Sequence, residues 1–240
     1  MKKLIVLIGL MVAVLSLYAQ TNSERELRDF TKITVGDRVN LHLIKGDQPH
    51  IRLESYDINF ADINAIVRNG HLHIYLDGAK MFDKREYYRN RTVDAYVTFV
   101  ELEKLVIKGD GFIECEDDIV ANKFTLKVYG DNDVRLAGLY ASKMVTKAYG
   151  DNDIIIENGT IAEQKFKLYG ENQINTLNIA SREGKVSIFG ESDVRLSAEH
   201  QLNYNIFGDA DIRFSGNPRV RQGIVMGEKS VYQYTDRRPE

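Results

Sequence analysis

The sequence has 240 residues, a formal net charge of -3 and 43% hydrophobic residues, so it is long enough for one or two domains with a substantial core. The charge balance is not basic, which gives no electrostatic reason to expect nucleic acid as a partner. A single cysteine, Cys115, excludes an intramolecular disulfide. Its place on an apolar strand face predicts a small core hydrophobe rather than a catalytic thiol.

The first 19 residues have the layout of a secretory signal peptide. Two lysines precede an apolar run from Leu4 to Leu17, and Ala19 supplies a small residue at the expected cleavage point. The run is short for a membrane span, and an uncleaved anchor is the alternative. The chain is therefore predicted to be exported, to the periplasm or the cell surface, with a signal peptide at 1–19, a linker at 20–28 and no transmembrane span after cleavage.

The next stretch predicts several short strands without a regular repeat. Four segments alternate between apolar and polar residues, as half-buried strands do: Phe30 to Leu43, His50 to Leu53, Leu72 to Leu76 and Thr92 to Thr98. We expect these strands either to open the solenoid formed by the repeats that follow or to form a β-cap on it. The charged and aromatic stretch Lys80–Arg91 is predicted to be an exposed loop.

Residues 105–216 contain the repeat that dominates the sequence. The segment YGDNDV returns as YGDNDI, YGENQI, FGESDV and FGDADI, after a weaker first copy, KGDGFI. One glycine stands in each copy, at spacings of 21, 20, 20, 20 and 18 residues: Gly109, Gly130, Gly150, Gly170, Gly190 and Gly208. A nearly fixed period of this length indicates stacked structural units. We expect each glycine to form a structural turn with positive φ.

Around each glycine the residues alternate with a period of two. Mostly apolar residues stand two and four positions before the glycine and four and six positions after it, with mostly polar residues between them. This pattern predicts two strands joined by a tight turn, and a further apolar stretch in each repeat predicts a third strand. One repeat cannot bury its apolar face alone, so the repeats should stack into an all-β parallel β-helix with coils of about 20 residues. A β-propeller is disfavoured because each blade needs about 40 residues.

Four segments carry a resemblance to a known family: FTKITVGDRVNLHLIKGD, RNGHLHIYL, AYVTFVELEKLVIKGDGFI and the closing DIRFSGNPRV. They resemble the auto-transporter adhesin head GIN domain family of secreted Bacteroidetes proteins, over about Asp29 to Gly227. The turns depart from that family, which usually has Ser-Gly-Ser-Gly where this chain has Tyr-Gly-Asp-Asn-Asp. The resemblance implies a right-handed β-helix and export, implies adhesion through its name, and supplies no catalytic residues. We therefore expect one β-helix domain at 29–227, followed by a C-terminal tail at 228–240.

Stacking turns the repeats into ladders of like side chains, of which one is acidic. Two acidic columns lie beside the turn and include Asp131, Asp133, Asp151, Asp153, Glu171 and Asp193. Asparagines between the two columns predict an amide ladder. Carboxylates about 5 Å apart repel by roughly 1 kcal/mol in water. In one interpretation solvation, basic neighbours and turn N–H groups offset this repulsion, and in the other calcium bound by successive coils does so.

A second ladder is aromatic and comprises Tyr129, Tyr149, Tyr169, Phe189 and Phe207. Stacked rings would stiffen the corner, and a row of rings is also a candidate platform for binding sugars. An outward basic face, with Lys127, Lys147 and Lys167 beside Arg135, Arg195 and Arg213, is typical of a solvated surface.

No asymmetric set of catalytic groups stands out in the sequence. The acids recur at matched positions, whereas a catalytic acid and base need different environments, and the five histidines show no metal-ligand spacing. We therefore expect an exported, non-catalytic module of the cell envelope, adhesin-like or structural, with no cofactor unless calcium binds. Its expected partner is a polysaccharide or an envelope protein. The alternatives are a β-helical carbohydrate-active enzyme and a calcium-stabilised scaffold.

Overall fold

The computed structural model describes residues 22–78, 88 and 91–234, so the predicted signal peptide at 1–19 lies outside the described residues. The described chain is built almost entirely of strands, with one short 3-10 helix, η2 (Phe60–Asp62). The strands are β1 (Asn22–Glu26), β2 (Lys32–Val35), β3 (Val39–Lys45), β4 (His50–Glu54), β5 (Ile63–Arg68), β6 (His71–Leu76), β7 (Val93–Phe99), β8 (Lys104–Lys108), β9 (Gly111–Thr176), β10 (Ile179–Ser197), β11 (Gln201–Ser215), β12 (Arg219–Met226) and β13 (Lys229–Gln233). Among the described residues we find no helix with the length and apolarity that a membrane crossing requires.

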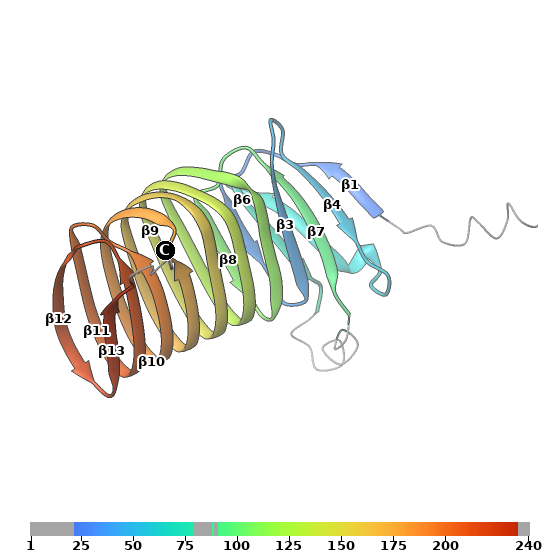
Figure 1. Cartoon of the computed structure of the whole chain (residues 1–240). Helices are drawn as coiled ribbons and strands as arrows, with labels where there is room; N and C mark the ends of the chain where they lie inside the picture. The colour runs from blue at the N-terminus through green and yellow to red at the C-terminus, as the bar shows by residue number, and fades with distance from the viewer. Residues whose placement is uncertain (1–21, 79–87, 89–90, 235–240) are drawn as a thin grey trace, which may run out of the picture.

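From β8 onward the chain winds into a parallel solenoid (Figure 1). β9 runs for 66 residues because the pairing with neighbouring coils continues through the corners, as it does at Gly170 and Gly190. β10 pairs in parallel with β9 on one side and with β11 on the other, so that Gly190 lies opposite both Gly170 and Gly208. The glycine period of the sequence is therefore the coil period, and the predicted β-solenoid is confirmed.

The inward columns form one continuous core. The residues two and four positions before each corner glycine, and four and six positions after it, are buried in every coil from Gly109 to Gly208. Cys115 belongs to these columns, and burial raises the pKa of its thiol to about 12. The thiol is therefore protonated at neutral pH and acts as a small core hydrophobe, as predicted.

The corner glycines adopt the backbone conformation that the sequence predicts. Their φ angles lie between 94° and 127° at all six positions, a region that side chains other than glycine rarely enter. A Cβ added to Gly150 would lie 2.2 Å from the carbonyl oxygen of Gly130 in the neighbouring coil. Both the backbone conformation and the close approach of the coils therefore require glycine at the corner.

The N-terminal coils are stacked in a different order from their order in the chain. β2 lies between β6 and β8, and β3 lies between β7 and β9, with all four pairings parallel. The first coil of the chain therefore occupies the second place in the stack, between the coil of β6 and β7 and the first regular coil (Figure 1). The chain forms an inner coil, passes outward, and returns past it to begin the regular repeats.

Antiparallel strands cover the N-terminal end of the solenoid. β5 pairs with β6, β4 pairs with β7, and β1 pairs with β4, all antiparallel. Both alternatives expected for the N-terminal strands are thus present: β2, β3, β6 and β7 belong to the solenoid, whereas β1, β4 and β5 form a cap on it.

The strands extend beyond the predicted domain boundaries at both ends. β1 lies within the predicted linker at 20–28, where the free edge of β4 gives it a pairing partner. β12 and β13 pair in parallel with β11, so the solenoid continues to Gln233, within the predicted tail at 228–240. In both places a neighbouring strand edge, which the local sequence pattern does not reveal, supplies the backbone hydrogen bonds.

Most of the predicted loop Lys80–Arg91 lies outside the described residues. Within it, Tyr88 is buried, and its hydroxyl donates to the carbonyl oxygen of Asp77 at 3.4 Å. Arg91 donates from its guanidinium to the carbonyl oxygen of Asp57 at 2.8 Å. The prediction of an exposed loop is therefore wrong for Tyr88, which packs into the core.

Candidate binding surface

The glycine corner carries the predicted aromatic ladder. The rings of Tyr129, Tyr149, Tyr169, Phe189 and Phe207 stack along the solenoid axis, with centroids 4.6–5.0 Å apart and planes within 2–5° of parallel. The spacing follows from the distance between coils, because each ring projects from the same position of its own coil. The ladder therefore stiffens one edge of the solenoid along five successive coils.

This geometry limits what the aromatic ladder can bind. A sugar ring stacks on the face of an aromatic ring, but each internal ring here has both faces covered by its neighbours. The internal rings are therefore left with their edges, and the tyrosines also with their hydroxyl groups. Burial, and then the neighbouring Tyr169 and Tyr129, raise the pKa of the Tyr149 hydroxyl, which keeps it a neutral donor. The expected sugar platform is thus restricted to the two ends of the ladder.

An amide ladder runs inside the same corner. The side chain of Asn132 donates to Asn152 at 3.1 Å, and Asn152 donates to Asn172 at 3.0 Å. All three are nearly fully buried, at 4%, 1% and 2% exposure. Asn132 and Asn172 also donate to the carbonyl oxygens of Tyr129 and Tyr169, at 3.3 Å in each case. The predicted amide ladder is confirmed, and it joins neighbouring turns from the inside.

The outer acidic column satisfies the backbone of the corner. The N–H of Asp131 donates to the carboxylate of Asp110 at 3.2 Å, and the N–H of Asp110 donates to Asp37 at 3.2 Å. At the other end of the solenoid, the N–H of Glu228 donates to Asp209 at 3.0 Å. Carboxylates of one coil thus accept from the turn of the next, as expected for acids that serve the turn.

The second acidic column is partly neutralised by arginines on the same strands. Asp133 pairs with Arg135 at 3.0 Å, and Asp211 pairs with Arg213 at 2.7 Å. Burial, and then the charge of Asp133, raise the pKa of the Asp153 carboxyl group. Within the part of the chain that the structure describes, no three acidic, histidine or cysteine side chains converge where they could hold a metal ion. The geometry of Asp131, Asp133, Asp151, Asp153, Glu171 and Asp193 therefore gives the predicted cation site no support.

A basic face lies on the other side of the aromatic ladder. Lys127, Lys147 and Lys167 each stand two residues before a stacked tyrosine and point outward. Lys32 and Lys104 lie opposite each other on β2 and β8, which continue this face toward the N-terminal end. The tyrosine ladder thus separates a row of ammonium groups from the two columns of carboxylates.

Two histidines extend the basic face onto β6. The rings of His71 and His73 lie 4.0 Å apart, and Nε2 of His71 lies 2.8 Å from the hydroxyl oxygen of Thr34. Burial lowers the pKa of His71, and the charges of His73, Lys104 and Lys32 lower it further. The neighbouring cations therefore oppose protonation of this ring.

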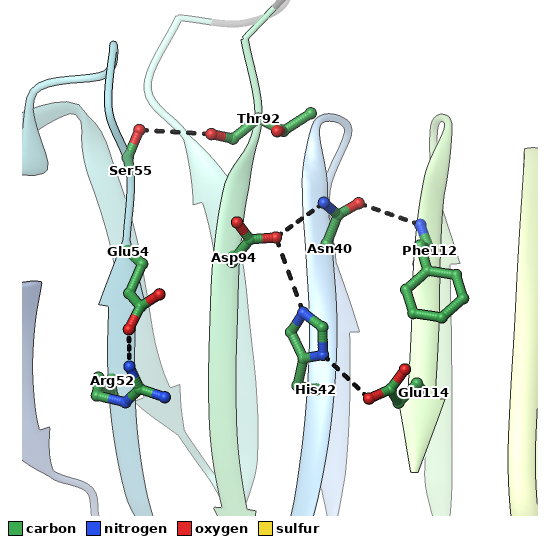
Figure 2. A network of polar contacts seen from close by, with 9 residues as sticks. All are labelled: Asn40, His42, Arg52, Glu54, Ser55, Thr92, Asp94, Phe112 and Glu114. Atoms are coloured by element: carbon green, nitrogen blue, oxygen red, sulfur yellow. Dashed lines mark hydrogen bonds and ion pairs between the residues drawn. The ribbon is translucent and has the colours of Figure 1, made fainter. Parts of the chain in front are cut away.

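A polar network on the acidic face links β7, β3 and β9, as Figure 2 shows. His42 lies between two carboxylates, with Nε2 3.7 Å from Asp94 and Nδ1 3.5 Å from Glu114. The amide of Asn40 donates to Asp94 at 2.9 Å and accepts from the backbone N–H of Phe112 at 3.2 Å. Three coils are thereby connected by side chains of different kinds.

An aromatic stack accompanies this network. The ring of His42 lies 4.5 Å from that of Tyr96, with an angle of 15° between the planes. The guanidinium of Arg52 covers the opposite face of Tyr96 at 3.9 Å from its centroid and also pairs with Glu54 (Figure 2). Sequence reasoning missed this group because Tyr96 comes from β7, which lies far along the chain from β3 and β4. The sequence indicated only that these side chains point outward, from the alternation of apolar and polar residues in their strands.

Comparisons with known proteins agree on family and fold. The family described as "Putative auto-transporter adhesin, head GIN domain" matches residues 29–218. A "putative adhesin" from Bacteroides fragilis has a TM-score of 0.76 at 18% identity, over 87% of this chain and 95% of that chain. A "putative adhesin" from Parabacteroides distasonis has a TM-score of 0.64 at 18% identity, over 87% and 95% of the two chains.

A further structure from Parabacteroides distasonis, titled "Putative lipid binding protein", has a TM-score of 0.66 at 17% identity, over 90% of this chain and 98% of that chain. At such identities these structures establish a common fold. No curated protein matches this sequence.

Proposed function

Because the chain belongs to the auto-transporter adhesin head GIN domain family, we propose that it is an exported, non-catalytic binding module of the cell envelope. The observation that carries this proposal is the regular stacking of equivalent residues from coil to coil, which gives the solenoid long, straight faces of uniform chemistry. Solenoids present such extended faces to extended partners. A polysaccharide or an elongated envelope protein fits this shape.

A catalytic function has less support. Acid–base catalysis needs two groups in different environments, whereas the carboxylates of the corner recur in similar surroundings. Several are already engaged, Asp110 and Asp209 with backbone N–H groups and Asp133 and Asp211 with arginines. Such groups serve the turn rather than a bound substrate. The predicted signal peptide at 1–19 supports export.

The proposal is tested by binding and by location. Purified protein lacking residues 1–19 should bind at least one member of an array of glycans and envelope proteins, without releasing a product. Protease added to intact cells should then distinguish the cell surface from the periplasm. Turnover of any glycan, abolished by one carboxylate substitution, would replace this proposal with an enzymatic function.

A further inference from the structure

Among the described residues, no carboxylate pairs with the lysines of the basic face. Five of them show no ion pair with any described residue: Lys32, Lys104, Lys127, Lys147 and Lys167. The contrast is with Lys143 and Lys185 on the same side of the solenoid, which share Glu163 at 2.7 and 2.9 Å. The face therefore carries ammonium groups whose charge is not compensated by any carboxylate in the described part of the chain.

These charges are close enough to repel one another. Neighbouring coils bring equivalent lysines within about 5 Å at the backbone, a distance at which like charges in water repel by roughly 1 kcal/mol. The pKa of Lys104 is lowered by burial and then by the charges of Lys127 and Lys32. A bound polyanion would relieve this repulsion along the whole row, whereas a single small anion would relieve it at one coil.

The positive charge is a local property of this face. The chain as a whole has a formal net charge of -3, and its acidic columns lie across the aromatic ladder. An anionic partner must therefore be narrow enough to contact the lysines without approaching Asp131 and Asp151 on the other side of the tyrosines. Because Lys127, Lys147 and Lys167 recur at the same position of three successive coils, the partner should also carry regularly spaced negative charges along one line.

We propose that this face binds a linear anionic polysaccharide, laid along the solenoid axis with its carboxylate or sulfate groups against Lys127, Lys147 and Lys167. One extended sugar chain is narrow, and its rings repeat at a length comparable to the coil spacing of about 4.8 Å. The outward tyrosine edges and hydroxyls next to the lysines supply further polar contacts for the sugar hydroxyls. This inference rests on the proposed binding function and names the class of its partner.

Nucleic acids and anionic bilayers fit the surface less well. Single-stranded nucleic acid is held by aromatic faces on which bases stack, and the internal ring faces of this ladder are closed. A nucleic acid duplex or an anionic bilayer is wider than the lysine row and would bring negative charge against the acidic columns. Both are therefore included as competing outcomes of the test.

The experiment measures binding of dextran sulfate and polygalacturonate to the protein lacking residues 1–19, with neutral dextran as the control. The variant Lys127→Gln/Lys147→Gln/Lys167→Gln should bind about tenfold more weakly or worse. The slope of log affinity against log salt concentration should also be smaller, by an amount that corresponds to about two to three fewer ionic contacts. The matched variant Arg135→Gln/Arg195→Gln/Arg213→Gln makes the same change in net charge on the acidic face and should bind like the unmodified protein.

A second variant tests the same idea in the opposite direction. Glu163→Gln frees Lys143 and Lys185 from their shared carboxylate, so it should strengthen binding of dextran sulfate. Circular dichroism of every variant confirms the strand content. Because Glu163→Gln predicts a gain, its result does not depend on whether the triple lysine variant folds.

Several results would overturn the inference. These are absence of binding to both anionic polymers, equal losses in the lysine and arginine variants, or tighter binding of single-stranded DNA or anionic vesicles through the same lysines. If the protein binds a different partner on the array while these polymers fail, the proposed function stands and only the partner class is wrong. If the array also fails, the proposed function fails with it.

Discussion

The regular coils and the N-terminal coils solve the same packing problem in different ways. In the regular coils each residue lies on its own equivalent, so that Tyr149 stacks on Tyr169 and Asn152 donates to Asn172. In the N-terminal coils the stack order differs from the chain order, and contacts join residues 37, 54 or 72 positions apart. Where coils repeat, each side chain must be able to pack against or hydrogen-bond with an identical side chain in the next coil. Where the stack order differs from the chain order, neighbouring side chains are of different kinds and form complementary pairs, such as His42 with Asp94.

The two arrangements differ in how many coils a single substitution affects. A residue in a self-pairing ladder has an equivalent partner on each side, so its loss affects two coils at once. A residue in a complementary pair has partners of other kinds that retain further contacts. We therefore expect matched substitutions to cost more in the regular coils than in the N-terminal coils, and four comparisons test this.

The largest expected effect is at the corner glycine. Gly150→Val forces a β-branched residue into φ of 109° and places its Cβ against the carbonyl oxygen of Gly130, which should lower the free energy of unfolding by about 3 kcal/mol or more. The N-terminal counterpart is Gly70→Val, at φ of 69° with no heavy atom beyond its chain neighbours within 4 Å of the added Cβ, which should cost about 1–2 kcal/mol. Equal losses in urea denaturation would contradict the role of coil spacing.

The second effect concerns buried amides. Asn152→Ala removes one of the two acceptors of the Asn132 amide and leaves the Asn172 amide oxygen without its donor in the core, so we expect a loss of about 2–3 kcal/mol. Asn40→Ala removes two hydrogen bonds from a half-buried site, where water replaces them, and should cost about 1 kcal/mol. Thermal melts of both variants decide the order, and a smaller loss for Asn152→Ala would argue against a cooperative ladder.

The third effect concerns stacked rings. Tyr149→Ala removes two parallel contacts from the middle of the ladder and should cost about 1–2 kcal/mol. Tyr96→Ala removes one ring contact with His42 and one cation–π contact with Arg52, and should cost about 1 kcal/mol. Chemical denaturation measures the free energy of unfolding of each variant. Equal losses in the two variants would show that the aromatic ladder adds no stability beyond that of the apolar core.

The smallest effect is a pH dependence confined to the N-terminal coils. The folded pKa of His71 lies below its ordinary 6.5, because of burial and then of His73, Lys104 and Lys32, and Arg68 stands opposite it on β5. The unfolded chain therefore binds the proton more readily, so stability is highest above about pH 6.5 and falls as the pH drops below it. His71→Gln should reduce this fall, as measured by thermal melts between about pH 7.5 and pH 5, a range that includes the ordinary pKa of histidine.

The regular coils should respond in a lower pH window. Hydrogen bonds from Lys143, and then from Lys185, hold the pKa of Glu163 below its ordinary 4.5. Its contribution is present above that value and is lost as the pH falls further, so Glu163→Gln should leave the slope above pH 5 unchanged. If Glu163→Gln removed the loss of stability near pH 6, that loss could not be attributed to His71.

The sequence by itself determined the coil period, the corner glycines, the inward columns and the self-stacking ladders. These features repeat along the chain, and alternation within one repeat fixes which side chains point inward wherever that repeat is stacked. The family resemblance and the predicted signal peptide were likewise available from short segments.

Only the tertiary structure decided how the N-terminal coils are ordered, which pairs form there, and which surface remains open. The alternation in β2 and β3 is compatible with any neighbouring strand, because backbone hydrogen bonds are the same for every sequence. Whether the aromatic rings cover one another's faces, and whether the lysines lie apart from the carboxylates, depends on the spacing and rotation of the coils. Contacts between residues many positions apart fix those two quantities, and no local pattern encodes them.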